Sequence, residues 1–290
     1  MRHLTLFVFS LFLISAPAAY GAQDVSLQAS AQHVASKARY IDNGKDAPAI
    51  LILHGFSATH NYPTVQSLQD FLSLSGYTTL APTLSLNIPL RTQPVNCNSL
   101  HTHTLDMDKA EVQAWIQWLE NQGHKKIILV GHSSGSQTLL EAMMDQAHDS
   151  VQALILTSLF YLSGEEIGNK KADQQRAEQM LAAGKNSPTK FNFLFCQNDY
   201  LATPESYLSY LTITRERVIS TLNQVTLPTY VIMGSKDTRY KQVGHHWLDE
   251  LAATQSQLIM IEGANHFFTG HHEGQLHDQI IDIIQQLDTP

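Results

Sequence analysis

Residues 127–135 have the sequence Ile-Ile-Leu-Val-Gly-His-Ser-Ser-Gly, and this stretch decides the fold. Its apolar first half, 127–130, has the length of a buried parallel strand. The segment 139–144 that follows places leucines and methionines on one face of a helix. Gly-x-Ser-x-Gly between a strand and a helix is the layout of a nucleophile elbow, a sharp turn that lifts a serine hydroxyl above a sheet. The candidate nucleophile is therefore Ser133.

Apolar runs alternate with helical patterns along most of the chain, which predicts βαβ units and a mostly parallel sheet of the α/β class. Besides the strand before Ser133, we expect strands at 48–53, 77–81, 151–157, 229–233 and 257–261. We expect helices at 63–75, from about 106 to 122, and around 280–287. Helices would then flank both faces of the central sheet.

The alternation is interrupted twice. Residues 82–103 contain three prolines and little periodicity, which predicts a long loop near the site. Residues 158–225 are polar and helical in pattern, with a helix over about 170–183 and a second one opened by Thr203-Pro204. We interpret 160–224 as a helical cap inserted late in the sheet, within one domain that spans 22–290.

A serine hydroxyl needs a base within hydrogen-bond reach, and the base needs a carboxylate that orients it. Asp237 and His266 each come just after a predicted strand, so both are expected at the same sheet edge as Ser133. They also follow the serine in the order acid, then histidine. The alternative for Asp237 is a turn or helix-cap residue, and Asp199 in the insert is the rival acid. We predict that Ser133, His266 and Asp237 are the catalytic residues.

Acyl transfer also needs hydrogen-bond donors for the oxyanion that forms at the substrate carbonyl. One candidate is the backbone N–H of Ser134, the residue after the nucleophile. The second is the backbone N–H of Phe56, in the loop that follows the strand at 48–53. The alternative is that His54-Gly55 only turns the chain out of that strand.

The chain resembles the esterase-like serine hydrolases of the α/β-hydrolase superfamily. The resemblance is carried by His54-Gly55-Phe56, the elbow at Ser133 and the loops that contain Asp237 and His266. The resemblance implies a Ser-His-Asp mechanism with an acyl-serine intermediate and no cofactor. A carboxylic ester is the expected substrate, with thioesters and amides as alternatives. An acyltransferase with the same triad and a non-catalytic binding protein of this fold remain alternatives.

The first 21 residues have the features of an export signal. A short basic start precedes an apolar stretch at 4–14, and small residues stand at 19 and 21. The stretch is shorter than the roughly 20 residues that span a bilayer as a helix. We expect a periplasmic or secreted protein without a stable membrane anchor. The formal net charge of −8, without a Lys/Arg cluster, argues against nucleic acid and anionic membrane surfaces as partners. The resemblance implies a small or lipophilic ester as the substrate.

The two cysteines, Cys97 and Cys196, would lie in an oxidising compartment. A bond between them would close a loop of about 100 residues and stabilise the fold by up to about 4.7 kcal/mol on the chain-entropy estimate. Two free thiols are the alternative. Several of the 15 histidines cluster in the sequence, but none has the spacing of a metal site, and we predict solvated side chains for 101, 103, 245, 246, 271, 272 and 277.

Overall fold

The computed structural model describes residues 21–288. The predicted export signal therefore lies outside the described residues, apart from Gly21. In the described part of the chain, no helix combines the length and the apolar character that crossing a bilayer requires.

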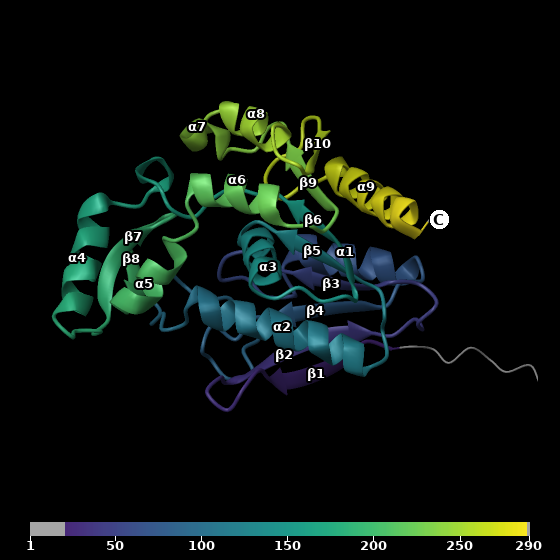
Figure 1. Ribbon diagram of the computed structural model, residues 1–290, viewed down its shortest axis with the longest axis horizontal. Coiled ribbons are helices and arrows are strands. Elements are labelled where there is room, and N and C mark those ends of the chain that lie inside the picture. The colour runs from purple at the N-terminus through teal and green to yellow at the C-terminus, as the bar shows by residue number, and fades with distance from the viewer. Residues whose placement is uncertain (1–20, 289–290) are drawn as a thin grey trace, which may run out of the picture.

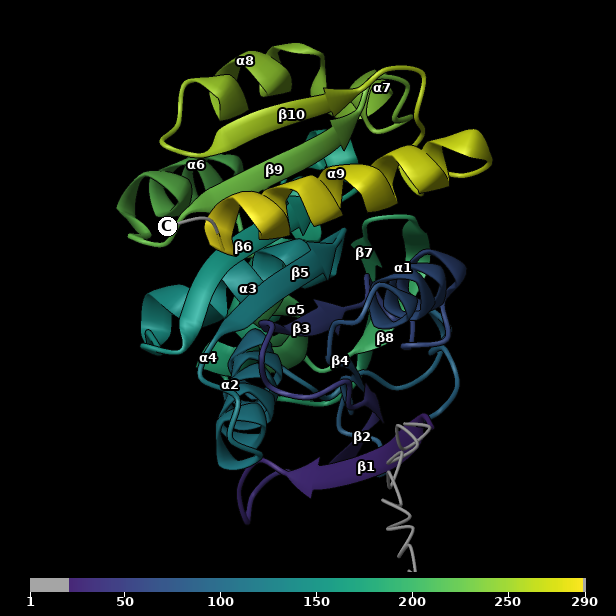
Figure 2. The same ribbon diagram turned by 90° about the vertical axis from the view of Figure 1, so that its right-hand side faces the viewer.

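An eight-stranded sheet forms the centre of the molecule, in the order β1-β2-β4-β3-β5-β6-β9-β10 (Figures 1 and 2). Only β2 runs antiparallel to its neighbours, and the other pairs are parallel. The strands are β1 (Gln23–Gln28), β2 (Ala35–Ile41), β3 (Ala49–Leu53), β4 (Thr79–Thr83), β5 (Ile127–His132), β6 (Val151–Thr157), β9 (Thr229–Gly234) and β10 (Gln257–Ile261). All six strands predicted from the sequence are present.

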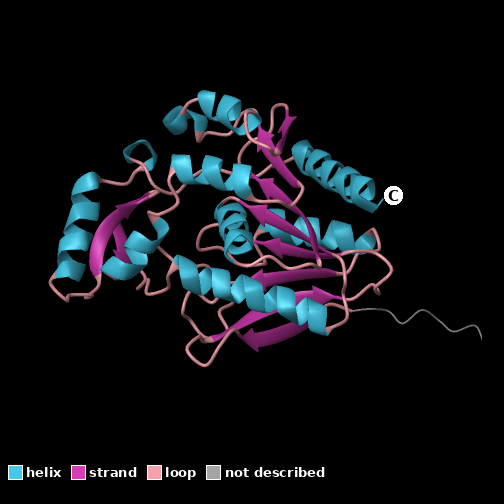
Figure 3. Cartoon of the chain, viewed as in Figure 1, coloured by secondary structure: helices cyan, strands magenta, loops and turns pink. Residues whose placement is uncertain are grey.

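Helices cover both faces of this sheet (Figures 2 and 3). One face carries α2 (Leu105–Asn121), α3 (Ser134–Asp145), α6 (Arg215–Gln224) and α8 (His246–Ala252), and the other carries α1 (Pro63–Leu74) and α9 (His271–Asp288). The α/β fold with a mostly parallel central sheet is thus confirmed.

Successive side chains of the central strands point to opposite faces of the sheet and so build two apolar cores. Leu51 and Leu129 point to the α2/α3 side, where Trp115 is fully buried. Their neighbours Ile50 and Ile128 point to the α1/α9 side. Because both faces are covered, these strands are apolar at nearly every position. Each such side chain contributes about 1.5–3 kcal/mol through its burial.

Chain order reverses at β3, which has β4 on one side and β5 on the other. Ligands bind at such a switch point in open α/β sheets, beyond the carboxyl ends of the strands. The loop after β3 contains Phe56, and the loop after β5 contains Ser133. The topology therefore places the predicted nucleophile and a predicted oxyanion donor beside each other.

The insert after β6 stands beside the sheet and contains η1 (Glu165–Ile167), α4 (Lys171–Ala182), β7 (Thr189–Phe193), β8 (Cys196–Ala202) and α5 (Pro204–Tyr210) (Figure 1). We call this segment, residues 159–214, the cap. The two strands pair as an antiparallel hairpin that the sequence analysis did not predict. The hairpin is stabilised on one side by buried aromatic rings, such as Phe191 stacked on Tyr207 at 4.2 Å.

The helix α6 lies inside the predicted insert, 160–224, but packs against α3 of the sheet layer. Arg217 on α6 pairs with the buried Glu141 on α3, with 2.8 Å between Nε and Oε1. The part of the insert that departs from the sheet layers therefore ends before α6.

Candidate active site

Ser133 stands at the turn between β5 and α3 with φ 54° and ψ −124°, a conformation that few residues other than glycine adopt. The two glycines of the motif make the turn possible. A Cβ on Gly131 would lie 2.6 Å from Cα of Ser136, and one on Gly135 would lie 2.5 Å from the carbonyl oxygen of His54. The tight packing of helix on strand therefore requires glycine at both positions.

The structure brings Ser133, His266 and Asp237 together. Nε2 of His266 is 3.0 Å from Oγ of Ser133, and Nδ1 of His266 is 2.6 Å from Oδ2 of Asp237. The loops after β5, β9 and β10 carry them, and these strands are parallel, so their carboxyl ends meet at one edge. Such a chain of hydrogen bonds can remove the serine proton and stabilise the imidazolium that results.

Buried contacts hold the acid and the base in place. Asp237 is 3% exposed, and its Oδ1 accepts a hydrogen bond from the backbone N–H of Arg239 at 2.8 Å. The hydroxyl of Ser158 donates to the carbonyl oxygen of His266 at 2.7 Å. The rival acid, Asp199, instead pairs with Lys190 across the cap hairpin at 2.8 Å. The geometry thus favours Asp237 as the partner of His266.

The two predicted oxyanion donors flank Ser133. A Cβ on Gly55 would lie 3.1 Å from Cβ of Ser133, so the backbone just before Phe56 runs against the nucleophile. Ser134 begins α3, where the first N–H groups have no partner within the helix. Within residues 21–288, the N–H groups of Phe56 and Ser134 donate to no other protein group. Both are therefore available to a ligand oxygen.

His54 anchors the loop that contains Phe56. The backbone N–H of Leu84 donates to its Nε2 at 3.1 Å, so Nδ1 carries the proton and donates to the carbonyl oxygen of Gly55 at 2.8 Å. Complete burial lowers the pKa of His54 to about 3, which keeps the ring neutral. The sequence analysis placed His54 in a motif but gave it no such role.

His132, the residue before the nucleophile, is also a buried neutral imidazole. Burial, with a smaller contribution from His266, lowers its pKa to about 3. The hydroxyl of Thr157 donates to the carbonyl oxygen of Gly131 and can therefore accept from Nδ1 of His132 at 3.0 Å. A neutral ring adds no positive charge beside His266, whose ring centroid lies 5.5 Å away.

A cavity of about 360 Å³ opens in front of the serine. Most of its wall is apolar and comes from the cap and from the loops after β3 and β10, while the loop after β9 adds a polar part. The lining residues are Gly55, Phe56, Ala58, Tyr62, His132, Ser133, Ile167, Leu194, Phe195, Thr238, Arg239, Gln242, His266 and Phe267. A site of this size and lining suits a small organic molecule with an apolar portion.

The cap is joined to the 82–103 loop by covalent and backbone bonds. Cys97 and Cys196 form a disulfide, with Cα atoms 5.6 Å apart, which settles the alternative left open by the sequence. The N–H of Leu201 donates to the carbonyl oxygen of Cys97 at 3.0 Å, and the N–H of His101 donates to that of Leu201 at 2.8 Å. The loop thus runs along β8 as a short extension of the hairpin.

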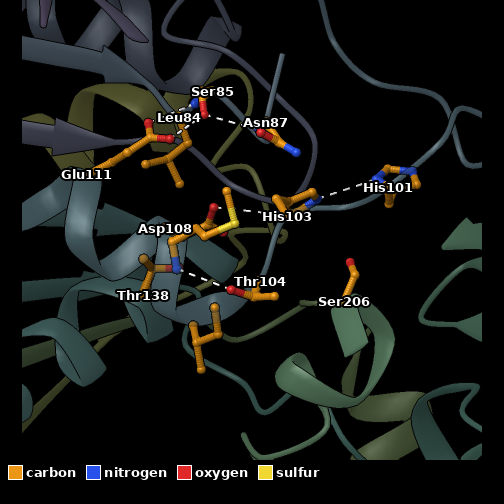
Figure 4. Close-up of polar contacts among 12 residues, drawn as sticks. Leu84, Ser85, Asn87, His101, His103, Thr104, Asp108, Glu111, Thr138 and Ser206 are labelled. Carbon is orange, nitrogen blue, oxygen red and sulfur yellow. Dashed lines mark hydrogen bonds and ion pairs between the residues drawn. The ribbon is translucent and has the colours of Figure 1, made fainter. Parts of the chain in front are cut away.

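Buried polar side chains reinforce this junction (Figure 4). His101 contacts His103 at 3.4 Å, and Nδ1 of His103 lies 2.6 Å from the hydroxyl of Tyr210 on α5. That hydroxyl donates to Asp108 on α2. In the same region the N–H of Ser85 donates to Glu111 at 2.8 Å (Figure 4). The junction therefore links the loop, α2 and the cap.

The prediction of solvated histidines was wrong at three positions. His101 and His103 are buried in the junction, and His277 is buried against Phe71, with ring centroids 4.6 Å apart. Between residues 21 and 288, no group of three or more His, Cys, Asp or Glu side chains is arranged to hold a metal ion.

The fold and the arrangement at the sheet edge define the class of an alpha/beta hydrolase. Residues 50–278 match the alpha/beta hydrolase family, and the chain belongs to this family. No curated protein matches the chain in sequence.

Solved structures share the fold at low sequence identity. Est1E from Butyrivibrio proteoclasticus is 17% identical, with a TM-score of 0.62, over 93% of this chain and 100% of that one. The esterase Pf2001 from Pyrococcus furiosus is 16% identical, with a TM-score of 0.58, over 92% and 93% of the two chains. A dienelactone hydrolase from Anabaena variabilis is 17% identical, with a TM-score of 0.56, over 91% and 98%.

Proposed function

We propose that this chain is an exported serine hydrolase that cleaves carboxylic esters through an acyl-enzyme. The observation that carries the proposal is the hydrogen-bond chain from Ser133 through His266 to Asp237, with lengths of 3.0 and 2.6 Å. It lies at the wall of a cavity that can hold a small ester. Neither a metal nor a cofactor is needed for this chemistry.

In the proposed reaction, Oγ of Ser133 attacks the ester carbonyl while His266 takes the hydroxyl proton. The N–H groups of Phe56 and Ser134 stabilise the negative charge on the carbonyl oxygen. His266 then gives its proton to the departing alcohol, which leaves an acyl-serine. A water molecule loses a proton to His266 and attacks the acyl group, and the acid and the free serine are released. Asp237 orients the imidazole throughout.

We assign the acyl pocket to the cap, because cap residues Leu194 and Phe195 line the cavity beside the nucleophile. The 82–103 loop supplies no lining residue and would act on the pocket through its disulfide to the cap. Phe195 is 66% exposed at the tip of the hairpin, so a smaller residue there is tolerated by the fold. We expect Phe195→Ala to change the preference for acyl chain length more than it changes the labelling of Ser133. A chain-length profile identical to that of the unmodified protein would refute this assignment.

Export is supported by two independent observations. The first 21 residues have the pattern of a secretion signal. The Cys97–Cys196 disulfide belongs to an oxidising compartment such as the periplasm or the cell exterior. Expression of the full chain, followed by fractionation and N-terminal sequencing of the processed protein, tests this part of the proposal.

Labelling by a fluorophosphonate probe tests the mechanism directly, because such probes react with activated serines. We expect the native protein to be labelled, and Ser133→Ala to lose both labelling and at least about 10⁴-fold in ester hydrolysis. Ser136→Ala serves as a matched control. Ser136 lies three residues further on, in α3, where it is buried and its hydroxyl donates to the carbonyl oxygen of Thr157. Equal labelling of Ser133→Ala would refute the proposal.

The same preparation separates hydrolysis from acyl transfer. Both reactions share the acyl-enzyme, and they differ in whether water or an alcohol resolves it. We expect the free acid as the product even when an acceptor alcohol is present. A new ester as the main product would instead identify an acyltransferase.

A further inference from the structure

Arg239 lies two residues after Asp237, in the loop between β9 and α7 (Tyr240–Val243). Its side chain is partly buried and lines the cavity in front of Ser133, together with Thr238 and Gln242. These three residues add polar groups to a lining that also contains Tyr62, Ser133 and two histidines and is otherwise apolar. A cation is thus present at the wall of the proposed active site.

The guanidinium of Arg239 has no partner within the described residues, and the other arginines there all have one. Four of them pair with carboxylates, and Arg91 donates to backbone carbonyl oxygens. Asp237 makes no hydrogen bond or ion pair with this guanidinium, and its carboxylate is instead bound by Nδ1 of His266 and by the backbone N–H of Arg239. The five N–H donors of the Arg239 side chain therefore remain available.

A partly buried guanidinium without a counter-ion is energetically unfavourable. Burial accordingly lowers the pKa of Arg239, and the nearby charge of Asp237 opposes that shift only in part. A carboxylate from a ligand would satisfy the side chain, since guanidinium binds carboxylate through two parallel hydrogen bonds. The formal net charge of −8 makes such a local cation more necessary, because the protein as a whole repels an anionic ligand.

We infer that Arg239 is a specificity-determining residue that binds a carboxylate of the substrate, so the preferred esters carry a second, anionic group. The apolar part of such a substrate would lie against Phe56, Tyr62 and Phe267, which line the same cavity. This inference rests on the function proposed above, because it assigns the substrate class of that site.

Two probes of equal length test the inference, mono-(4-nitrophenyl) glutarate and 4-nitrophenyl valerate. They differ only in a terminal carboxylate that replaces a methyl group. Binding is measured by calorimetry on Ser133→Ala, which keeps the cavity and lacks the nucleophile. We expect the anionic probe to bind about 10- to 100-fold more tightly than the neutral one, as for a hydrogen-bonded charge pair. The double variant Ser133→Ala/Arg239→Gln should lose that preference.

Turnover of the same two probes by the protein with Ser133 intact gives a second measurement. We expect the ratio of kcat/KM for the anionic over the neutral probe to fall by about 10- to 100-fold in Arg239→Gln. In Arg239→Lys, which keeps the charge and loses the two-pronged geometry, the ratio should fall less. Lys241→Gln is the matched control. Lys241 is exposed, follows Arg239 by two residues and does not line the cavity, so this variant removes one positive charge without changing the site.

The two proposals can fail separately. Equal affinity of Ser133→Ala for both probes, or a preference that survives Arg239→Gln in the folded protein, would overturn the assignment of Arg239 and leave the serine hydrolase standing. The opposite result is also possible: the protein binds the anionic probe more tightly through Arg239 but neither reacts with fluorophosphonate nor hydrolyses either probe. That result would refute the serine hydrolase and keep Arg239 as an anion-binding residue. Circular dichroism confirms that each variant is folded.

Discussion

The sheet edge and the cap junction are stabilised by different interactions. At the edge, Ser133, Asp237 and His266 are positioned by strands whose apolar residues fill two cores. At the junction, a disulfide and a set of buried polar contacts join the 82–103 loop, α2 and the cap. Apolar periodicity is visible in a sequence, whereas pairing between distant polar segments is not. The first region was therefore predictable and the second was not.

The largest loss of stability is expected at the elbow, where the backbone atoms around Gly135 leave no space for a side chain. In Gly135→Ala, the new methyl group would lie 2.5 Å from the carbonyl oxygen of His54 and 2.6 Å from that of Leu53. Because both neighbours are backbone atoms of β3 and its loop, we expect a loss of about 3 kcal/mol or more in the free energy of unfolding. Denaturant unfolding and fluorophosphonate labelling would both report the damage.

Gly274→Ala provides the control for that substitution. Gly274 lies exposed within α9, and a Cβ there would meet no atom within 4 Å. Alanine favours helix over glycine, so we expect this variant to be as stable as the native protein or up to about 1 kcal/mol more stable. A Gly135→Ala protein that matched Gly274→Ala in stability would show that α3 can move away from β3 without a loss of free energy.

The next effect concerns the junction. The double variant Cys97→Ala/Cys196→Ala opens a link across a sequence separation of 99 residues, and we expect it to lose about 2 kcal/mol in the free energy of unfolding, well below the chain-entropy ceiling. Hydrogen exchange should accelerate more in the cap than in β5, because the disulfide fixes the cap to the loop. The reducing agent that destabilises the native protein should leave the double variant unchanged. Uniform acceleration over cap and sheet would contradict the division into two regions.

The sequence predicted six of the eight strands of the sheet and placed the three residues of the proposed triad in adjacent loops. It missed β1 and β2, whose exposed faces carry polar residues such as Ser26 and Lys37, so that neither has a continuous apolar run. It also missed the cap hairpin, because Gln197, Asn198 and Asp199 make β8 resemble a loop. These strands are defined by partners far away in the chain, which local patterns do not reveal.

The roles of individual side chains could also be predicted at the sheet edge but not at the junction. The proposed triad could be predicted from residue type and order, because each member comes just after a strand. The histidines of the junction were misjudged, since only the tertiary structure shows that Tyr200 covers His101, with ring centroids 4.3 Å apart. The unpaired side chain of Arg239 could likewise be recognised only once every other charged partner was placed.

The smallest expected effect is a change in the stability of the junction with pH. Glu111 is buried beside the junction, and burial raises the pKa of its carboxyl group from 4.5 to about 7, against the opposing hydrogen bonds from Ser85. Asp108 adds to this increase, and Arg91 is the nearby cation. A raised pKa means that the folded state holds this proton more tightly than the unfolded state does. The contribution of Glu111 to stability is therefore complete below about pH 4.5 and is lost as the pH rises through about 7.

Glu111→Gln removes this titration while it keeps an acceptor for Ser85. Compared with the native protein, the variant should gain relative stability as the pH increases from 4.5 to 7, by at most about 1.4 kcal/mol per pH unit, as measured by thermal unfolding at a series of pH values. The exposed Glu178→Gln should run parallel to the native protein over the same range. If the Glu111→Gln curve also runs parallel, the carboxyl group titrates at its ordinary pKa. The junction would then be wet enough to solvate a charge, unlike the dry apolar cores that hold the sheet edge.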